Sequence, residues 1–376
     1  MSGYLAPECL LEMPTGIWRV DLRGRTVRKT DHEKATGLVA AEGSATLPEQ
    51  KLTKLRLAHA NGAEPVGPNV IRQTTISTSV ELSGISLHKG TMVQLVLKPA
   101  EADSGIVFRR TDLATDDVEV TDVAARYDTV CDTTMCTVIG NAAGTTIGTI
   151  EHIMAAISAL RIDNLLIEID AHEVPVMDGS SDAFVAALDQ AGLSELPAPR
   201  RFIRLTRSIA IEDGAKNAEL SPNDDGLRVE FSIDFDNKVI GRQELGVDVS
   251  PESFRGDVSN ARTFGFLEDY EKLRSLGLAH GASLDNAVVL DGDKVMNEGG
   301  LRAPDEFVRH KILDAIGDLS LAGAPILGCY RASRAGHAFN NQMLHALFAD
   351  QTAWEYVTLC HEAAKPDMSR IAISAD

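Results

Sequence analysis

The sequence predicts an α+β fold made of two similar halves. Alternating apolar and polar residues at 75–82 and 92–97, separated by glycine-containing turns, are typical of antiparallel strands. A comparable order of two strands, a proline-containing turn and a third strand recurs at 208–235. In each half a helix, a short apolar strand and a second helix follow. We therefore expect a diverged duplication in which each half layers a β-sheet with helices.

Four segments are expected along the chain. Residues 1–69 mix charged residues, Gly and Pro without strong periodicity, which indicates a poorly ordered N-terminal extension. Domains are expected at 70–197 and 202–366, followed by a C-terminal tail at 367–376. Leu196-Pro-Ala-Pro-Arg-Arg201, between the domains, has the composition of a linker.

The helices of the two halves correspond to one another. The helix of the first half begins near Thr149, a candidate N-cap, and the motif helix of the second half is expected at 308–321. His152 and His310 then hold similar positions, and pseudo-symmetry would bring both to the domain interface, a common place for a site. Residues 263–304 interrupt the correspondence, and we interpret them as an insertion that shapes the substrate site. The other expected elements are strands at 105–110, 164–169, 208–211, 217–220, 227–235 and 326–331 and helices at 182–191 and from His337.

Composition restricts the classes of function. The 376 residues carry a net charge of −19, which argues against general nucleic-acid binding and against a polybasic membrane surface. The five cysteines are odd in number and lack C-x-x-C spacing, as in a reduced cytosolic protein. The chain has neither a basic leader with an apolar core nor a run of about 18 apolar residues. We expect a cytoplasmic protein with no transmembrane segment and no nucleic-acid partner.

Residues 305–318 carry polar groups where a helix would present an apolar stripe. Helical spacing puts His310, Asp314 and Asp318 on one face, among apolar positions. His310 and Asp314, four residues apart, can hold one metal ion. A buried histidine that donates a hydrogen bond to a carboxylate would have the same spacing, so the pair alone leaves both interpretations open.

A histidine on the other helix extends this pattern. His152, His310 and Asp314 form a set of three ligands that leaves one coordination position open for water, as in hydrolytic zinc sites. Glu151 directly precedes a ligand, which is the position of a general base. A glutamate in the first turn of a helix also favours the helix dipole, so its position alone does not decide its role.

Hydrolysis of an acyl compound also requires a group that contacts the oxyanion and an acid for the leaving group. Thr263 and His337 are available for these roles. His337 begins a helix, and a helix N-terminus lowers the pKa of an imidazole. Asp318 lies one turn beyond Asp314, and we expect it to accept a hydrogen bond from His337 and keep the imidazole protonated near neutral pH.

Four stretches, spread over about residues 71–345, resemble the UDP-3-O-acyl-N-acetylglucosamine deacetylase family. They are Thr149-Ile-Glu-His-Ile-Met154, Asn260-Ala-Arg-Thr-Phe-Gly-Phe266, residues 305–318 and Gly336-His-Ala-Phe-Asn-Asn341. The resemblance implies a zinc-dependent amidohydrolase that removes the N-acetyl group of a UDP-linked, 3-O-acylated N-acetylglucosamine, the committed step of lipid A biosynthesis. It also implies two similar domains packed helix face to helix face around the active site, with an insertion in each. We expect a monomer.

The resemblance assigns roles to individual residues. It implies that zinc binds to His152, His310 and Asp314, with Glu151 as the general base and His337 as the general acid. Thr263 would contact the oxyanion, Asp318 would support the acid and Lys311 would bind the nucleotide phosphates. The residues expected to contact the rest of the substrate, several of them along a hydrophobic passage for the acyl chain, are Phe264, Leu267, Tyr270, Ser283, Leu284 and Val289.

Two other classes of protein share parts of this pattern. Non-haem Fe(II) oxygenases also use two histidines and one carboxylate, but their sites typically lie on all-β barrels. A non-catalytic nucleotide-sugar binder with a structural metal would not require an acid and a base beside the ligands. Ligands on two helices and a glutamate next to one of them favour hydrolysis.

Overall fold

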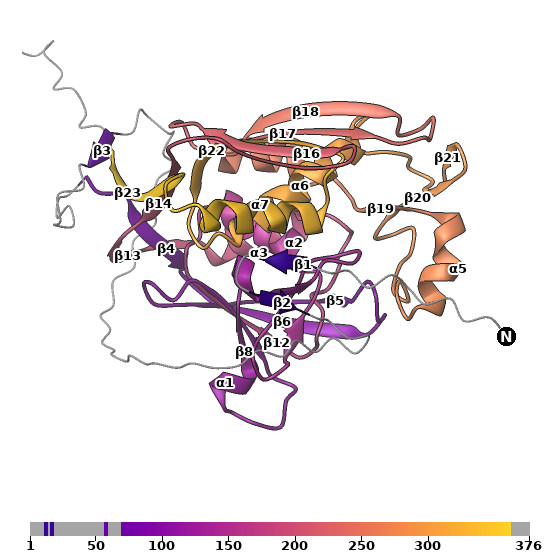
Figure 1. The fold of residues 1–376 in the computed structure, drawn as a ribbon. Helices are drawn as coiled ribbons and strands as arrows, with labels where there is room; N and C mark the ends of the chain where they lie inside the picture. The colour runs from indigo at the N-terminus through magenta and orange to yellow at the C-terminus, as the bar shows by residue number, and fades with distance from the viewer. Residues whose placement is uncertain (1–10, 14–15, 19–55, 59–68, 362–376) are drawn as a thin grey trace, which may run out of the picture. The chain divides into compact units, whose positions relative to one another are not determined.

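The computed structural model describes residues 11–13, 16–18, 56–58 and 69–361 (Figure 1). The chain divides into two units, Met1–Gly43 and Ser44–Asp376. In the first unit β1 (Leu11–Met13) pairs antiparallel with β2 (Gly16–Trp18). The other described elements belong to the second unit. The expected tail at 367–376 and most of the expected extension at 1–69 lie outside the described residues.

The first sheet of the second unit has the strand order β5-β6-β12-β7-β8. β12 runs parallel to β7, and the other neighbouring pairs are antiparallel. Buried residues alternate along β6 and β12, so one face of the sheet carries the apolar side chains. The strands are β5 (Val80–Ile85), β6 (Met92–Pro99), β7 (Ile106–Arg110), β8 (Asp122–Ala124) and β12 (Leu165–Ile169).

The second half repeats this topology, as the sequence predicted. β15 pairs with β16, β16 with β22, β22 with β17 and β17 with β18. Of these four pairs, β17–β22 is the parallel one, in the place that β7–β12 holds in the first half. The strands are β15 (Ile209–Asp213), β16 (Lys216–Pro222), β17 (Leu227–Asp234), β18 (Arg242–Asp248) and β22 (Ile326–Ser333).

One more antiparallel pair of strands accompanies each half. β4 (Arg72–Ile76) pairs with β13 (Leu193–Pro199), and β14 (Arg201–Leu205) pairs with β23 (Trp354–Cys360). β14 also pairs in parallel with β22, which joins this pair to the second sheet, and the other neighbour of β23 is β3 (Arg56–Ala58). The prediction of a linker at 196–201 was wrong, because these residues include the end of β13 and the start of β14. β13 is an edge strand with an irregular register before Pro199, and an edge strand tolerates proline because its outer N–H groups need no ladder partner.

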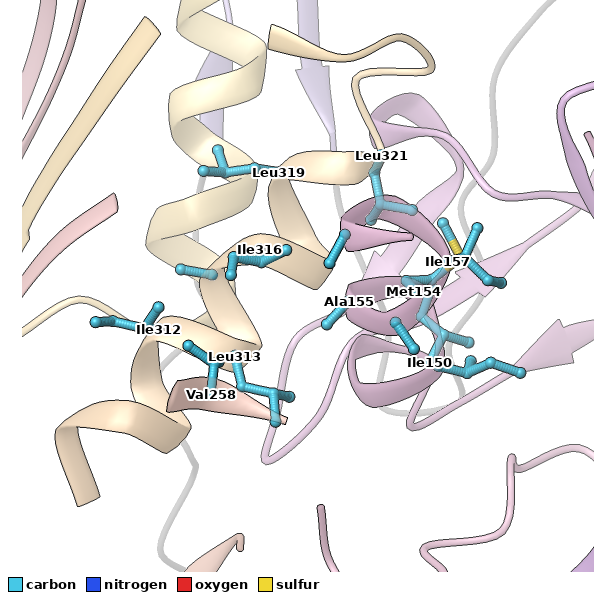
Figure 2. Packing of buried hydrophobic residues seen from close by; sticks show 14 of the residues in the cluster. Ile150, Met154, Ala155, Ile157, Val258, Ile312, Leu313, Ile316, Leu319 and Leu321 are labelled. Atoms are coloured by element: carbon cyan, nitrogen blue, oxygen red, sulfur yellow. The ribbon is translucent and has the colours of Figure 1, made fainter. Parts of the chain in front are cut away.

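Four helices lie between the two sheets (Figure 1). They are α2 (Glu151–Ala159), α3 (Asp182–Ala191), α6 (Glu306–Ser320) and α7 (His337–Ala349). Helices α2 and α6 pack directly against each other, and Figure 2 shows their apolar side chains in one continuous core. Gly317 allows the backbones of the two helices to come close together. A side chain there would not fit, because a Cβ atom on Gly317 would lie 2.0 Å from the carbonyl oxygen of Glu151. This contact brings the polar start of α2 against the C-terminal half of α6.

Each half also contains an insertion. In the first half β9 (Val130–Asp132), β10 (Val138–Gly140) and β11 (Thr146–Ile147) form a small sheet, preceded by α1 (Val118–Thr121) and η1 (Tyr127–Thr129). In the second half α4 (Pro251–Ser253) and η2 (Phe254–Val258) precede β19 (Phe264–Phe266), α5 (Leu267–Ser275), β20 (Val288–Asp291) and β21 (Lys294–Val295). Two glycines let the second insertion approach the first half closely. A Cβ on Gly179 would lie 2.1 Å from Asn286 O, and one on Gly281 would lie 2.2 Å from Ser86 O.

Candidate metal centre and active site

Three buried ligand groups meet where α2 and α6 pack together. His152 is in the first turn of α2, and His310 and Asp314 are one turn apart on α6. Their ligand atoms all lie within 4.8 Å of one another. Asp314 Oδ1 is 3.3 Å from His310 Nε2 and 3.7 Å from His152 Nε2. The structure therefore brings together the three residues that the sequence predicted as ligands.

The chemistry of this group fits a metal ion. Asp314 Oδ1 is buried and has no hydrogen-bond partner within the described part of the chain, although an unpaired buried carboxylate oxygen is costly. His310 Nδ1 lies 3.1 Å from Ala261 O, so it donates a hydrogen bond there and leaves Nε2 free to act as a ligand. Burial lowers the pKa of His310 to about 3 and also lowers that of His152. Both imidazoles are thus neutral, the form that binds metals.

Glu151 precedes the candidate ligand His152 and is 4% exposed. Its Oε2 accepts a hydrogen bond from the backbone N–H of Thr137 at 3.0 Å. Burial raises the pKa of Glu151 to about 7, against the opposing charge of His337. This carboxylate is a stronger base than an ordinary glutamate and is partly ionised at neutral pH.

His337 and Asp318 form the hydrogen bond that the sequence predicted. His337 is the first residue of α7, and its Nδ1 donates to Asp318 Oδ2 at 2.9 Å. Burial alone would lower the pKa of His337, but Asp318 outweighs it and the pKa is raised to about 9. His337 is therefore an imidazolium at neutral pH.

The loop before β19 lies beside the candidate ligand His310. Ala261 accepts the hydrogen bond from that ring, and the ring of Phe264 lies 6.2 Å from it, measured between centroids. Thr263, which lies between these two residues in the sequence, is held through its backbone. Its N–H donates to Gly179 O and its C=O accepts from Val288 N, both at 2.8 Å. Lys311 Nζ donates to Asp314 Oδ2 at 2.6 Å and lies 5.7 Å from the centre of the Phe264 ring. Lys311 thus contacts the carboxylate of a candidate ligand.

The other predicted substrate residues lie on the second insertion. Leu267 and Leu284 are 37% and 46% exposed, which is high for apolar side chains. Tyr270 lies beneath the guanidinium of Arg274, 5.6 Å from its ring centre. Ser283 is exposed and Val289 is half-buried on β20. These exposures are compatible with a surface that contacts an acyl chain.

Several contacts at the site were not predicted. Thr149 was expected to cap α2, but Ile150 holds the N-cap position and the Thr149 hydroxyl donates to Glu173 Oε1 at 3.1 Å. Thr137 donates its hydroxyl to Asp318 Oδ1 at 2.6 Å, and Asn340 Nδ2 donates to Asp318 Oδ2 at 2.8 Å. Threonine and asparagine carry no local signal of such roles, because their partners lie far away in the sequence.

No helix among the described residues is long and apolar enough to cross a bilayer.

Comparisons with known proteins identify the family of this chain. A family model described as UDP-3-O-acyl N-acetylglycosamine deacetylase matches residues 73–349. UDP-3-O-acyl-N-acetylglucosamine deacetylase of Idiomarina loihiensis is 48% identical over 297 residues, which cover 78% of this chain and 95% of the relative. The protein of the same name from Aliivibrio fischeri is 46% identical over 299 residues, 79% of this chain and 96% of the relative. The chain belongs to the UDP-3-O-acyl-N-acetylglucosamine deacetylase family.

Proposed function

We propose that this chain hydrolyses the N-acetyl group of UDP-3-O-(3-hydroxyacyl)-N-acetylglucosamine, giving acetate and the free amine in the committed step of lipid A biosynthesis. The observation that carries the proposal is the buried group of His152, His310 and Asp314, with an unpaired carboxylate oxygen facing two imidazole nitrogens. The names of the relatives supply the substrate.

The resident metal is proposed to be zinc. Two neutral imidazoles and one carboxylate are a typical ligand set for a catalytic zinc ion, although iron accepts the same donors. When bound, the metal would supply Lewis-acid activation of a water molecule and of the amide carbonyl. Asp314 would contribute its free Oδ1, while its Oδ2 remains bonded to Lys311.

Glu151 and His337 are proposed to move the protons. Glu151 accepts a proton from the attacking water, for which its pKa of about 7 is suited. His337, with a pKa of about 9, donates a proton to the amide nitrogen as the carbon–nitrogen bond breaks. The ionised Glu151 also favours the protonated His337, so the two groups support each other's reactive form. Thr263, beside Ala261 and Phe264, is proposed to contact the oxyanion.

The second insertion is proposed to receive the acyl chain. Phe264, Leu267, Tyr270, Ser283, Leu284 and Val289 are the proposed contacts. Lys311 is proposed to bind the nucleotide phosphates, sharing its ammonium group with Asp314.

The substitution Val289→Lys tests the passage for the acyl chain, because it would bury a charge against that acyl chain. It should therefore impair an acylated substrate far more than a UDP-N-acetylglucosamine analogue without the chain. Equal impairment of both compounds would remove the passage from the proposal.

We also propose that the enzyme works as a monomer in the cytoplasm, with domains at 70–197 and 202–366. The described cysteines Cys131, Cys136, Cys329 and Cys360 are free thiols, which is compatible with a reducing compartment. Sedimentation would test the monomer, and fractionation of cells would test the compartment.

Mass spectrometry of the purified, zinc-loaded protein with UDP-3-O-acyl-N-acetylglucosamine tests the activity. The expected result is loss of one acetyl group from the substrate, abolished by a chelator and restored by zinc. The matched control is Glu151→Gln, which preserves shape and should keep zinc while turnover falls on the order of 10²- to 10⁴-fold. Deacetylation should proceed without O₂, since an oxygenase requires it. An unchanged substrate with the metal-loaded protein would refute the proposed activity.

A further inference from the structure

Thr137 contacts two carboxylates of the site at once. It is 1% exposed and directly precedes β10 in the first insertion. Its backbone N–H donates to Glu151 Oε2 at 3.0 Å, and its hydroxyl donates to Asp318 Oδ1 at 2.6 Å. A single residue therefore bridges the proposed base on α2 and the partner of the proposed acid on α6.

The Thr137 hydroxyl completes a set of donors around Asp318. Oδ2 of that carboxylate accepts from His337 Nδ1 and from Asn340 Nδ2, and Asn340 Oδ1 accepts in turn from the Tyr330 hydroxyl at 2.8 Å. With Asn340 on one oxygen and Thr137 on the other, the plane of the carboxylate is fixed. A fixed acceptor for Nδ1–H orients the imidazole of His337 and determines where its other nitrogen, Nε2, points.

We propose that Thr137 is a positioning residue for the reaction. It holds Asp318 in the orientation that aims His337 at the leaving nitrogen, and it holds Glu151 from the same point. The charged groups that face His337 are Asp318 and Asp314 of α6 and Glu151 of α2. This inference rests on the proposed function, because it assigns an effect on the acid and base of that reaction.

The two contacts of Thr137 can be separated by mutation. Thr137→Val removes the hydroxyl and keeps the branched shape, so the bond to Asp318 is lost while the backbone bond to Glu151 remains. Thr137→Ser keeps the hydroxyl and loses only a methyl group. Thr137→Ala also lacks the hydroxyl and is smaller than valine, so it serves if the valine variant does not fold.

The test uses the full, zinc-loaded chain and two readouts. In Thr137→Val, kcat should fall on the order of tenfold with KM and zinc content unchanged, because the bond serves the proton donor and not substrate binding. The downfield NMR signal of the His337 Nδ1 proton, assigned by its loss in His337→Gln, should shift or broaden. Thr137→Ser should restore both the rate and the signal.

Three outcomes would overturn the proposal. The first is a kcat within about twofold of wild type in Thr137→Val together with an unchanged Nδ1 proton signal. The second is a Thr137→Ser variant as impaired as Thr137→Val, because packing would then matter and not the hydroxyl. The third is full activity in Thr137→Ala with an unshifted signal. A wild-type protein that does not deacetylate would refute the proposed function, while the NMR signal would still test whether Thr137 orients His337.

Discussion

Among single residues, Asp314 shows how the site depends on individual atoms. Its two oxygens differ: Oδ2 accepts from Lys311 Nζ, whereas Oδ1 faces the Nε2 atoms of His310 and His152 and has no donor among the described residues. A carboxylate paired on one side and open on the other is arranged for a cation. The neutral state of both histidines follows from the same burial.

Replacing His310 by alanine removes one ligand of a buried set of three. His310→Ala should abolish tight zinc binding and activity together, because two remaining ligands do not hold the ion firmly. Metal content by mass spectrometry and turnover are the measurements. The exposed His280 supplies the control, since His280→Ala should retain both properties. Full zinc stoichiometry and normal turnover in His310→Ala would remove the ligand assignment.

The pH dependence of the reaction should report His337. The proposed mechanism requires the imidazolium, so kcat/KM should fall as the pH rises through the pKa of about 9. Burial lowers that pKa and Asp318 raises it. Asp318→Asn should therefore move the alkaline limb to lower pH, with a larger loss of activity at alkaline than at mildly acidic pH and with zinc retained.

The exposed Asp213 provides a matched control for this measurement. Asp213→Asn should leave the whole pH profile in place. If the alkaline limb did not move in Asp318→Asn, another group would be the acid.

At the scale of elements, the packing of α2 on α6 positions the ligands. Gly317 lies in the interior of α6, where glycine is unfavourable for a helix. Its lack of a side chain lets the backbone of Glu151 approach, since a Cβ would lie 2.0 Å from Glu151 O. The same contact brings His152, the residue after Glu151 in α2, close to Asp314.

Gly317→Ala should separate these helices. Because the clash is with backbone atoms and not with a flexible side chain, the variant should lose about 1–3 kcal/mol of stability, as is typical of an overpacked core, and bind zinc more weakly. Thermal unfolding and zinc affinity are the measurements. Gly256→Ala is the control, since a Cβ there meets no atom within 4 Å. A Gly317→Ala protein with wild-type stability and zinc affinity would contradict the account of this interface.

At the scale of the whole molecule, all the proposed site residues lie outside the N-terminal segment. The match to the family model begins at residue 73, and the site residues lie between Thr137 and Asn340. The described part of residues 1–69 includes β3, which belongs to the second unit. β3 pairs with β23 at an edge of the second sheet.

Deletion of residues 1–69 should leave turnover intact. It removes β3 and so exposes β23, and a moderate loss of thermal stability is expected as a result. Deletion of residues 1–43 retains β3 and is the comparison that separates the two effects. Turnover and melting temperature would be measured for both proteins. A shortened protein that has native circular dichroism but no activity would make the N-terminal segment part of the site.

The sequence by itself determined those features that follow from local geometry. The spacing of His310, Asp314 and Asp318 predicts one face of a helix, because a helix brings residues four apart together wherever it lies. The order of strands and helices predicted the repeated topology. Local composition misled at 196–201, where the pairing of an edge strand outweighed the prolines. It also misled at Thr149, whose hydroxyl bonds to Glu173 instead of capping α2.

Only the tertiary structure decided the contacts between distant segments. Thr137 and Asp318 are 181 residues apart, and the approach of Gly317 to Glu151 depends on how two helices pack. Such contacts have no local signal, because a threonine hydroxyl or a glycine Cα can serve many partners and its neighbours in the sequence do not specify which. The physical reason is that local geometry sets the positions of side chains along an element, whereas burial and packing between elements select their partners.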